Sequence, residues 1–484
     1  MKDYDFPVNE GEVNIRLLVQ VLRQQNLPFR VALAEDATSV VAIREYDSTS
    51  NRIFGFSLPL SSNGLPDFRL SKALNAENIV DMFCNYQRAS SITVIMAQPL
   101  AINAEPVRIC YFATNNKFTA SDVENRIAYV TSELKRNGIW VDTYSADGDP
   151  RELKMMRHIL SLGTCPTSNR IRKTTLIQPE NPLFRLSKKW TWFAAQVVTE
   201  RIPVQDTIHL GAKFRVRLLK RERGIFMVLG NKNASCSDLE HLLRRVLKDL
   251  HLLRDGDINQ HDKMNYDAVE RLCNPNIRNL LGIHVPGSKA TCFYLKLVEY
   301  CTSSYLDKKL KPLERIYKIW FVNFALRLWR FWILCDDTYN LQQHFVTPNI
   351  SECVEVNAHS LLLTIINLKK ENLPQLLMPW KFSSQSCEGL FRLLRSASST
   401  SSTQTNFSVR NFAVDKGRKV DVRLRATAEN MNDGVLYPRN RKTFDEDIAA
   451  HHPIHELPSE EEMEITVLQA QKDAEAHSYA DRCR

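Results

Sequence analysis

The hydrophobic positions of the first 160 residues fall into short runs separated by turn-forming and polar segments. Three runs rich in Val, Ile, Ala and Phe predict strands, with the turn DSTSN (47–51) inside the first of them; the runs are 29–58, 91–100 and 107–115. Helices are predicted by spacing at 75–88, 121–136 and 151–160, with another strand at 139–146 and a further short one near 203–210. This alternation of strands and helices is typical of a layered α/β domain.

Capping signals delimit the predicted helix at 121–136. Ser121 is a candidate N-cap, with Glu124 three residues on to complete a capping box, and Gly138 follows the last helical position.

From about residue 216 to 375 helical periodicity dominates. The clearest predicted helices are 237–252, 291–306 and 312–335, and Pro312 fits the first turn of the last one. This block is predicted to be a separate all-α unit. Another amphipathic helix follows at 386–396.

The most apolar stretch, residues 316–334, predicts a buried helix. Lys318, Asn323, Arg327 and Arg330 interrupt it, whereas a membrane-spanning helix needs about 20 residues with few charges. We therefore expect no membrane anchor. The polar positions 323, 327 and 330 share one helical face, which indicates either a nucleic-acid-facing stripe or arginines paired with acids inside the fold.

Residues 399–484 begin with the polar run STSSTQTNFSV, continue with mixed charges and contain the acidic run Glu460-Glu461-Glu462. This composition predicts a low-complexity, largely disordered tail, with a short helix near 460–476 left open.

Charge is distributed unevenly over the 484 residues, whose net charge is +9. The segment after residue 398 carries 12 basic and 15 acidic residues, a net −3, so the rest carries +12. A basic body fits either a polyanionic partner or a merely solvated surface.

The 11 cysteines are scattered, and no two lie at C-x-x-C spacing, so no zinc-finger or zinc-ribbon signature is present. The polar, acidic start MKDYDFPVNEGEV does not read as a signal peptide. Free thiols in a reducing compartment are therefore expected.

Three acidic positions are candidates for metal-dependent chemistry. Asp36 lies at the first β run, Asp147 follows the strand at 139–146, and Glu388 opens the helix at 386–396. Nucleotidyl transfer on phosphodiesters uses carboxylates that hold two divalent cations about 3.5–4 Å apart. Because many acidic residues are present, spacing alone is a weak argument, and Asp before Gly is most often a turn residue.

The segments around these acids resemble the catalytic blocks of P-element-type transposases, whose animal members often carry a THAP zinc finger. EDATSVVAIREYDSTSNRIFGF resembles the first block, with Asp36, Tyr46, Asp47 and the run Ile53-Phe54-Gly55-Phe56 at matching positions. GIWVDTYSADGDPR resembles the second block through Asp147-Gly148, and SQSCEGLFRLLRS the third, through Glu388, Phe391 and Arg395.

A further segment, QDTIHLGAKFRVRLL, is similar to a signature that follows the second block and contains His209, Lys213 and Arg215. The four blocks occur in the order of the family, and the resemblance covers roughly residues 30–398. No Cys/His zinc-coordinating module precedes the first block here, which departs from the family and leaves target recognition open.

The resemblance implies an α/β RNase H-like core interrupted by an all-α insertion domain, with a disordered C-terminal tail. We expect the core over 1–215, the helical insertion over 216–378, the helix that completes the core over 379–398 and the tail over 399–484. It also implies that Asp36, Asp147 and Glu388 are the catalytic residues and the ligands of Mg²⁺ or Mn²⁺.

Two neighbouring acids compete with these assignments. Asp149 lies two residues after Asp147 and is a candidate cap for the helix at 151–160. Glu35 precedes Asp36, and because successive strand residues point to opposite faces, only one of the two can point into the site.

The partner implied by the resemblance is DNA, in the nucleus, with homo-oligomerisation left open. Residues expected to face DNA phosphates are basic positions that form one run: His209, Lys213, Arg215, Arg217 and Lys220. A solvated basic surface is the alternative. GTP use follows by analogy only, because no G-x-x-x-x-G-K-[ST] loop is present and Asn231-Lys232-Asn233-Ala234 only half resembles a guanine-reading motif.

Three functions stay open on sequence. The first is a transposase-like enzyme that cleaves and joins DNA strands, with water and then a 3′-hydroxyl as nucleophiles. The second is a catalytically inactive domesticated or truncated relic that binds DNA or protein. The third is an α/β scaffold of unrelated descent.

Overall fold

The structure, a computed structural model, describes residues 9–162, 190, 193, 195, 197–220, 227–229, 232–259, 261–396, 407–416 and 454–480. The chain divides into two compact units. The first comprises residues 1–155, 200–202 and 381–450, and the second residues 156–199, 203–380 and 451–484. Ile202, the first residue of a strand, thus groups with one unit and the rest of that strand with the other. The boundaries expected at 216 and 378 stay a prediction.

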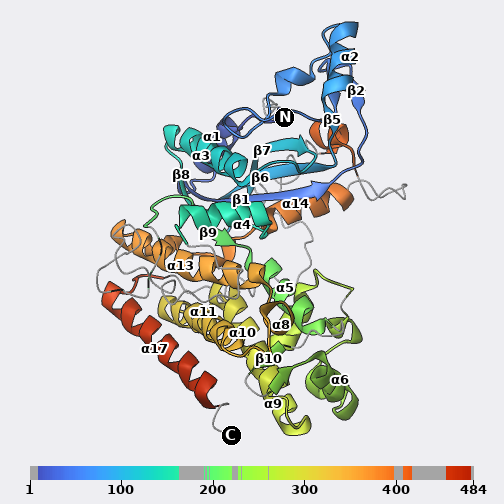
Figure 1. Cartoon of the computed structure of the whole chain (residues 1–484). Coiled ribbons are helices and arrows are strands. Elements are labelled where there is room, and N and C mark those ends of the chain that lie inside the picture. The colour runs from blue at the N-terminus through green and yellow to red at the C-terminus, as the bar shows by residue number, and fades with distance from the viewer. Residues whose placement is uncertain are drawn as a thin grey trace. The chain divides into compact units, whose positions relative to one another are not determined.

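A five-stranded sheet has the strand order β7-β6-β1-β8-β9 (Figure 1), and its first four strands belong to the first unit. The strands are β1 (Arg30–Ser39), β6 (Ser91–Pro99), β7 (Val107–Thr114), β8 (Trp140–Ala146) and β9 (Ile202–Gln205). β6 runs antiparallel to both β1 and β7, whereas β1 and β8 are parallel. The sheet is therefore mixed. Helices of this part of the chain are α1 (Ile15–Gln24), α2 (Ala76–Asn85), α3 (Ala120–Arg136), α4 (Pro150–Ile159) and α14 (Gln385–Ser396).

Alternation along β1 sends neighbouring side chains to opposite faces of the sheet. Glu35 pairs with Arg126 of α3 on one face, whereas Ala34 packs against α14 on the other. The core on the α14 face also contains residues of 407–416, among them Phe407, Val409 and Phe412, and a short π-helix (Asn411–Lys416) ends that segment.

Residues 10–14 run along the outer edge of β7. The backbone N–H groups of Gly11 and Asn14 donate to the carbonyls of Tyr111 (2.8 Å) and Ile109 (2.7 Å). Glu10 accepts from the N–H of Ala113 at 2.7 Å through Oε1. Burial raises the pKa of Glu10 to about 7, although this hydrogen bond and the charge of Arg52 lower it.

A small excursion separates β1 from β6. It contains η1 (Phe68–Ser71), α2 and two small antiparallel sheets. β2 (Glu45–Asp47) and β3 (Arg52–Phe54) form a hairpin, whereas β4 (Phe56–Ser57) pairs with β5 (Gln87–Arg88) after η1 and α2. Gly55 joins β3 to β4 with φ +96°, and a Cβ there would lie 2.0 Å from the carbonyl oxygen of Ile43. Only glycine fits this close approach.

The second unit is mainly helical. Its helices are α5 (Thr207–Leu219), α6 (Cys236–Arg245), α7 (Lys248–His251), α8 (Tyr266–Cys273), α9 (Pro275–His284), α10 (Lys289–Leu306), α11 (Pro312–Leu334), α12 (Leu341–His344), α13 (Pro348–Lys370) and α17 (Glu460–Ala480). A hairpin of β10 (Met227–Leu229) and β11 (Lys232–Ala234) lies between α5 and α6. α11 packs against α10, α13 and α17, and among the helices the structure describes, none is long and apolar enough to cross a membrane.

Several local predictions are confirmed and several are wrong. Pro312 lies in the first turn of α11, and Gly138 follows α3 with φ +76°. The cap of α3 is Thr119, whose side chain and that of Asp122 form the capping box that we placed at Ser121 and Glu124. The helix expected at 237–252 divides into α6 and α7, because Val246 and Leu247 adopt extended conformations.

The tail is better ordered than its composition predicted, in the parts that the structure describes. Residues 407–416 join the core of the first unit, and α17 packs on α11 through Met463, Val467, Ala470 and Ala474, which are fully buried. The remaining tail positions, 399–406, 417–453 and 481–484, lie outside the described residues.

Candidate active site

The register of β1 with β8 ends two residues before Asp36 and Asp147. Ala34 of β1 is the partner of Ser145 in β8; Asp36 lies two residues further along β1, and Asp147 directly follows Ala146, the last residue of β8. Such strands are about 4.8 Å apart, and residues at matching positions share a face. Asp36 is nearly buried, with 8% of its surface exposed, and Asp147 is half-buried.

The chain turns sharply after Asp147. Gly148 has φ +89°, a conformation that favours glycine, and α4 begins at Pro150. Asp147 Oδ1 accepts from the N–H of Asp149 at 3.0 Å, which orients the carboxylate at the end of β8. The Asp147-Gly148 pair therefore forms a turn and also positions the Asp147 carboxylate directly after the end of β8.

Asp149 has the capping role expected of it. Its Oδ1 accepts from the N–H of Arg151 at 2.8 Å, and the Arg151 guanidinium pairs with Oδ2 at 2.7 Å. The hydrogen bonds from Arg151 hold the pKa of Asp149 below its usual value in spite of partial burial. This pairing favours Asp147 over Asp149 as the site residue.

Glu35 belongs to the opposite face of the sheet. Both its carboxylate oxygens accept from the guanidinium of Arg126, Oε2 at 3.0 Å, and Arg126 also donates to the carbonyl of Gly64 at 3.3 Å. The side chains of this pair are 1% and 0% exposed. Glu35 is therefore tied into the interior beneath α3, which leaves Asp36 for the α14 face.

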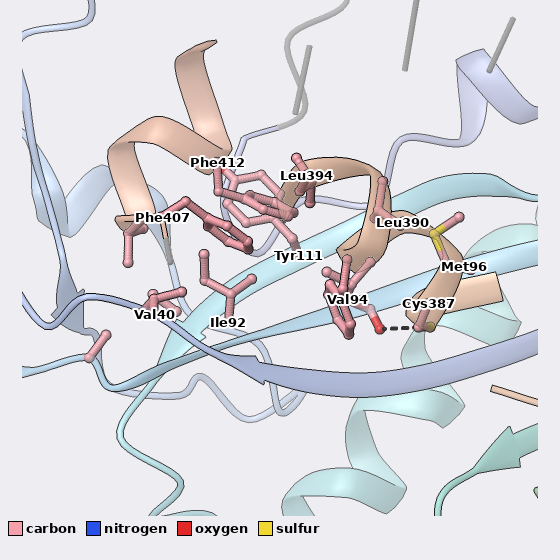
Figure 2. Packing of buried hydrophobic residues seen from close by; sticks show 14 of the residues in the cluster. Val40, Ile92, Val94, Met96, Tyr111, Cys387, Leu390, Leu394, Phe407 and Phe412 are labelled. Carbon is pink, nitrogen blue, oxygen red and sulfur yellow. Dashed lines mark hydrogen bonds between the residues drawn. The ribbon is translucent and has the colours of Figure 1, made fainter. Parts of the chain in front are cut away.

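Helix α14 places Glu388 on the face that carries Asp36. Cys387, the preceding residue, is fully buried, and its Sγ lies 3.6 Å from the carbonyl oxygen of Ala34. The same Sγ lies 3.8 Å from the carbonyl oxygen of Val94 (Figure 2). Val94 is the strand partner of Asp36. Burial raises the pKa of the Cys387 thiol well above its usual value, and the negative charges of Asp36 and Glu388 add to that rise.

The packing that fixes α14 is apolar. Leu390 and Leu394 lie one helical turn apart and face β6, with Phe407 and Phe412 beside them over Tyr111 (Figure 2). The ring centroids of Tyr111 and Phe412 are 5.0 Å apart. Segments hundreds of residues apart in the chain therefore build the surface on which Glu388 is mounted.

Glu152, in the first turn of α4, was not anticipated. Its side chain is buried, and its pKa is raised well above the usual value by burial and then by the nearby charges of Glu35, Asp147 and Asp149. A buried acid in a first helical turn has no signal in the sequence, because helix dipoles favour acids there on any helix.

The carboxylates do not form a closed metal site. Among the residues that the structure describes, no group of three or more His, Cys, Asp or Glu side chains could hold a metal ion. Asp36 lies in β1, Asp147 follows β8 and Glu388 lies in α14, and these three expected ligands do not form such a group.

The predicted basic run lies on α5 and is largely inside the second unit. Arg215 is 2% exposed and donates to the carbonyls of Asp257 (2.9 Å) and Gly256 (3.0 Å). Arg217 is 6% exposed and donates to the carbonyl of Phe345 at 2.9 Å. These two guanidiniums hold loops of the helical unit, which weighs against their predicted contact with DNA.

The other members of the run differ in exposure. His209 is buried in the first turn of α5, and Lys213 donates to Asn349 Oδ1 at 3.0 Å. Lys220 is exposed at the C-terminal end of α5. A DNA-binding role of His209, Lys213 and Lys220 stays a prediction.

Two arginines lie on α14, the helix that contains Glu388. Arg392 and Arg395 follow Glu388 by four and seven residues, the spacing of one helical face, and both are exposed. Arg395 donates to Thr38 Oγ1 at 2.6 Å, and Thr38 follows Asp36 on the same face of β1. The resemblance had included Arg395 without a role, and only the packing of α14 on β1 shows its position.

The other sequence candidates have structural places. Arg327 pairs with Glu355 at 2.6 Å, so this arginine of the α11 stripe pairs with an acid inside the fold. Residues 232–234 of the half-matching guanine motif form β11, and Asn231 lies outside the described residues.

Comparison with known proteins gives an informative likeness among solved structures. No protein-family model matches the chain, and no curated protein matches its sequence. Among solved structures, the chain is similar to the Drosophila P element transposase strand transfer complex, with a TM-score of 0.57 and 13% sequence identity. The match covers 87% of this chain and 83% of that chain.

The likeness shows a shared fold. At this level of identity it says nothing of activity, but its coverage extends over most of both chains, so it is not confined to the sheet. The mixed α/β architecture expected on sequence agrees with it.

Proposed function

We propose that this chain is a transposase-like protein that binds DNA at the edge of the sheet carrying Asp36 and Asp147. The observation that carries the proposal is the β1–β8 register, in which Ala34 pairs with Ser145, two residues before Asp36 and Asp147. Support comes from the fold shared with a P element transposase and from the packing of α14, the helix that contains Glu388, on the face of the sheet that carries Ala34.

In this proposal Asp36, Asp147 and Glu388 are the ligands of Mg²⁺ or Mn²⁺ and the catalytic residues. A divalent ion held there would activate the attacking oxygen of water or of a 3′-hydroxyl and stabilise the leaving oxygen. Action on chromosomal DNA implies a nuclear protein.

Exposed arginines on α14 suit the proposed substrate. Arg392 and Arg395 share the helical face of Glu388, and guanidiniums pair with phosphate oxygens in two-point contacts. We assign to them the DNA backbone next to the reacting phosphate. Use of GTP would fall to the helical unit and rests on family analogy alone.

A second function is favoured by a specific observation. Because the described acids form no three-ligand group, the chain also fits an inactive relic that binds DNA or protein without cleaving it. The two functions differ in whether metal binds to the folded protein.

Thermal unfolding with and without Mn²⁺ separates them. A ligand that binds only the folded state at 100 times its Kd stabilises it by about 2.7 kcal/mol. The active-site proposal predicts a rise in Tm that is lost in Asp36→Asn, Asp147→Asn and Glu388→Gln. Asp81→Asn, a change at an exposed acid on α2, is the matched control and should keep the rise.

Strand cleavage is the second readout. Oligonucleotide substrates should be cut only with Mg²⁺ or Mn²⁺, and Asp147→Asn should abolish the cut while Asp81→Asn retains it. No Tm rise and no cleavage by the wild type would favour the relic, and metal-independent cleavage would exclude the mechanism.

A further inference from the structure

The surface of the second unit carries an apolar patch in the region of α7 and α9. We call Leu247, Leu250, Leu252 and Ile283 the leucine patch. These side chains are 76%, 55%, 65% and 72% exposed, respectively. Isolated exposed apolar residues are ordinary, but a group of four large ones marks an interaction surface.

Local structure holds the leucine patch outward. Asn276 Nδ2 donates to the carbonyl of Leu250 at 2.8 Å, and Arg245 Nη1 donates to the carbonyl of His284, next to Ile283, at 3.0 Å. Leu252 adopts a left-handed conformation with φ +56°, which is costly for a bulky residue. Leu252 therefore has a strained backbone at a position where its side chain is exposed.

The rim of the leucine patch is basic. Arg244, Arg245, Lys248 and Arg254 are exposed around it, against Asp249 and Asp255. This combination fits a partner surface that is apolar at its centre and acidic at its margin.

Such a surface exists on the same chain. The inner face of α17 is buried on α11, but its outer face exposes Ile465 (62%) and Leu468 (38%). Glu461 precedes Ile465 by one helical turn, and Glu464 lies beside it. In the single chain both the leucine patch and the outer face of α17 remain open to solvent.

We propose that the outer face of α17 in one copy docks on the leucine patch of a second copy. Ile465 and Leu468 cover the leucines, while Glu461 and Glu464 face Arg244 and Lys248. Each copy carries both surfaces, so a two-fold arrangement makes the contact twice.

The dimer is independent of the catalytic proposal, because all of its residues lie in the helical unit. Sedimentation velocity of the full chain over a concentration series tests it. The wild type should dimerise, and Arg244→Glu with Lys248→Glu should raise the dimer Kd by about tenfold or more, since like charges then face each other.

The decisive variant combines charge reversal on both surfaces. Glu461→Lys with Glu464→Lys should weaken the dimer in the same way, and all four changes together should restore it. Ile465→Ser should weaken it without altering charge. Lys263→Glu with Lys309→Glu, at exposed positions outside the leucine patch, is the matched control and should leave the dimer Kd unchanged.

Circular dichroism of each variant verifies folding. A wild type that stays monomeric at about 100 µM overturns the proposal, and so does a dimer that persists unchanged in the variant Arg244→Glu with Lys248→Glu. Loss of the dimer in both reversed pairs without recovery in the fourfold variant also overturns it, because the two surfaces then do not face each other.

Discussion

The buried pair of Glu35 and Arg126 offers a direct test of how β1 assigns its two acids. If Glu35 serves the interior and Asp36 the site, Glu35→Gln should destabilise the fold and leave metal binding intact. The pair is nearly inaccessible to solvent, so Glu35→Gln leaves Arg126 with a buried charge that no carboxylate balances. Breaking such a pair costs about 3–5 kcal/mol.

Urea unfolding followed by circular dichroism measures the change in the free energy of unfolding. Glu35→Leu with Arg126→Met removes both charges and should recover most of the loss, because an apolar pair of similar size removes the desolvation cost. The matched control is Glu133→Gln, which breaks an exposed pair with Arg136 and should cost less than about 1 kcal/mol.

Two results would refute the reasoning. One is a Glu35→Gln variant that loses less than about 1 kcal/mol, the range of a surface pair. The other is loss of the Mn²⁺-induced rise in Tm in Glu35→Gln while Asp36→Asn retains it, which would exchange the roles of the two acids.

Two more predictions concern segments far from the acids in sequence. Phe412→Ala should destabilise the first unit by about 3–5 kcal/mol, because the ring is fully buried between Tyr111 and Phe407. Urea unfolding measures this loss, and a change below about 1 kcal/mol would show that residues 407–416 do not belong to this core. The raised pKa of Glu10 means that the folded chain binds a proton at this carboxyl more tightly than the unfolded chain does. The free energy of unfolding should therefore fall by roughly 3 kcal/mol as the pH rises from about 4.5 to about 7. The variant Glu10→Gln should lack this fall, and an equal pH dependence of the free energy of unfolding in both proteins would contradict the assignment.

Local patterns predicted the elements of the first unit well. The runs at 91–100 and 107–115 became β6 and β7, and the helix expected at 151–160 became α4, because period and turn residues act over a few neighbours. The wrong N-cap predicted for α3 also concerns only neighbouring residues. Thr119 and Ser121 are both good N-cap residues, and only the path of the chain after Phe118 selects Thr119.

Predictions from composition were wrong where the packing of distant segments determines whether a segment is ordered or buried. The segment 407–416 follows a Ser- and Thr-rich run and was assigned to a disordered tail, yet Phe407, Val409 and Phe412 complete the core over β6. Similarly, Arg215 and Arg217 looked like a basic surface, whereas they donate to loop carbonyls inside the second unit. Charge in a sequence does not tell whether backbone carbonyls from distant loops surround it.

By itself the sequence determined the succession of strands and helices, the mixed α/β character and the three acids worth testing, since periodicity, turns and motif order are properties of neighbouring residues. Only the tertiary structure decided how the segments that carry these acids are arranged. The parallel pairing of β1 with β8 brings together segments that are more than 100 residues apart, and burial of Cys387 against Ala34 and Val94 fixes α14, the helix that contains Glu388. These arrangements depend on pairing and close packing between distant segments, which no local pattern encodes.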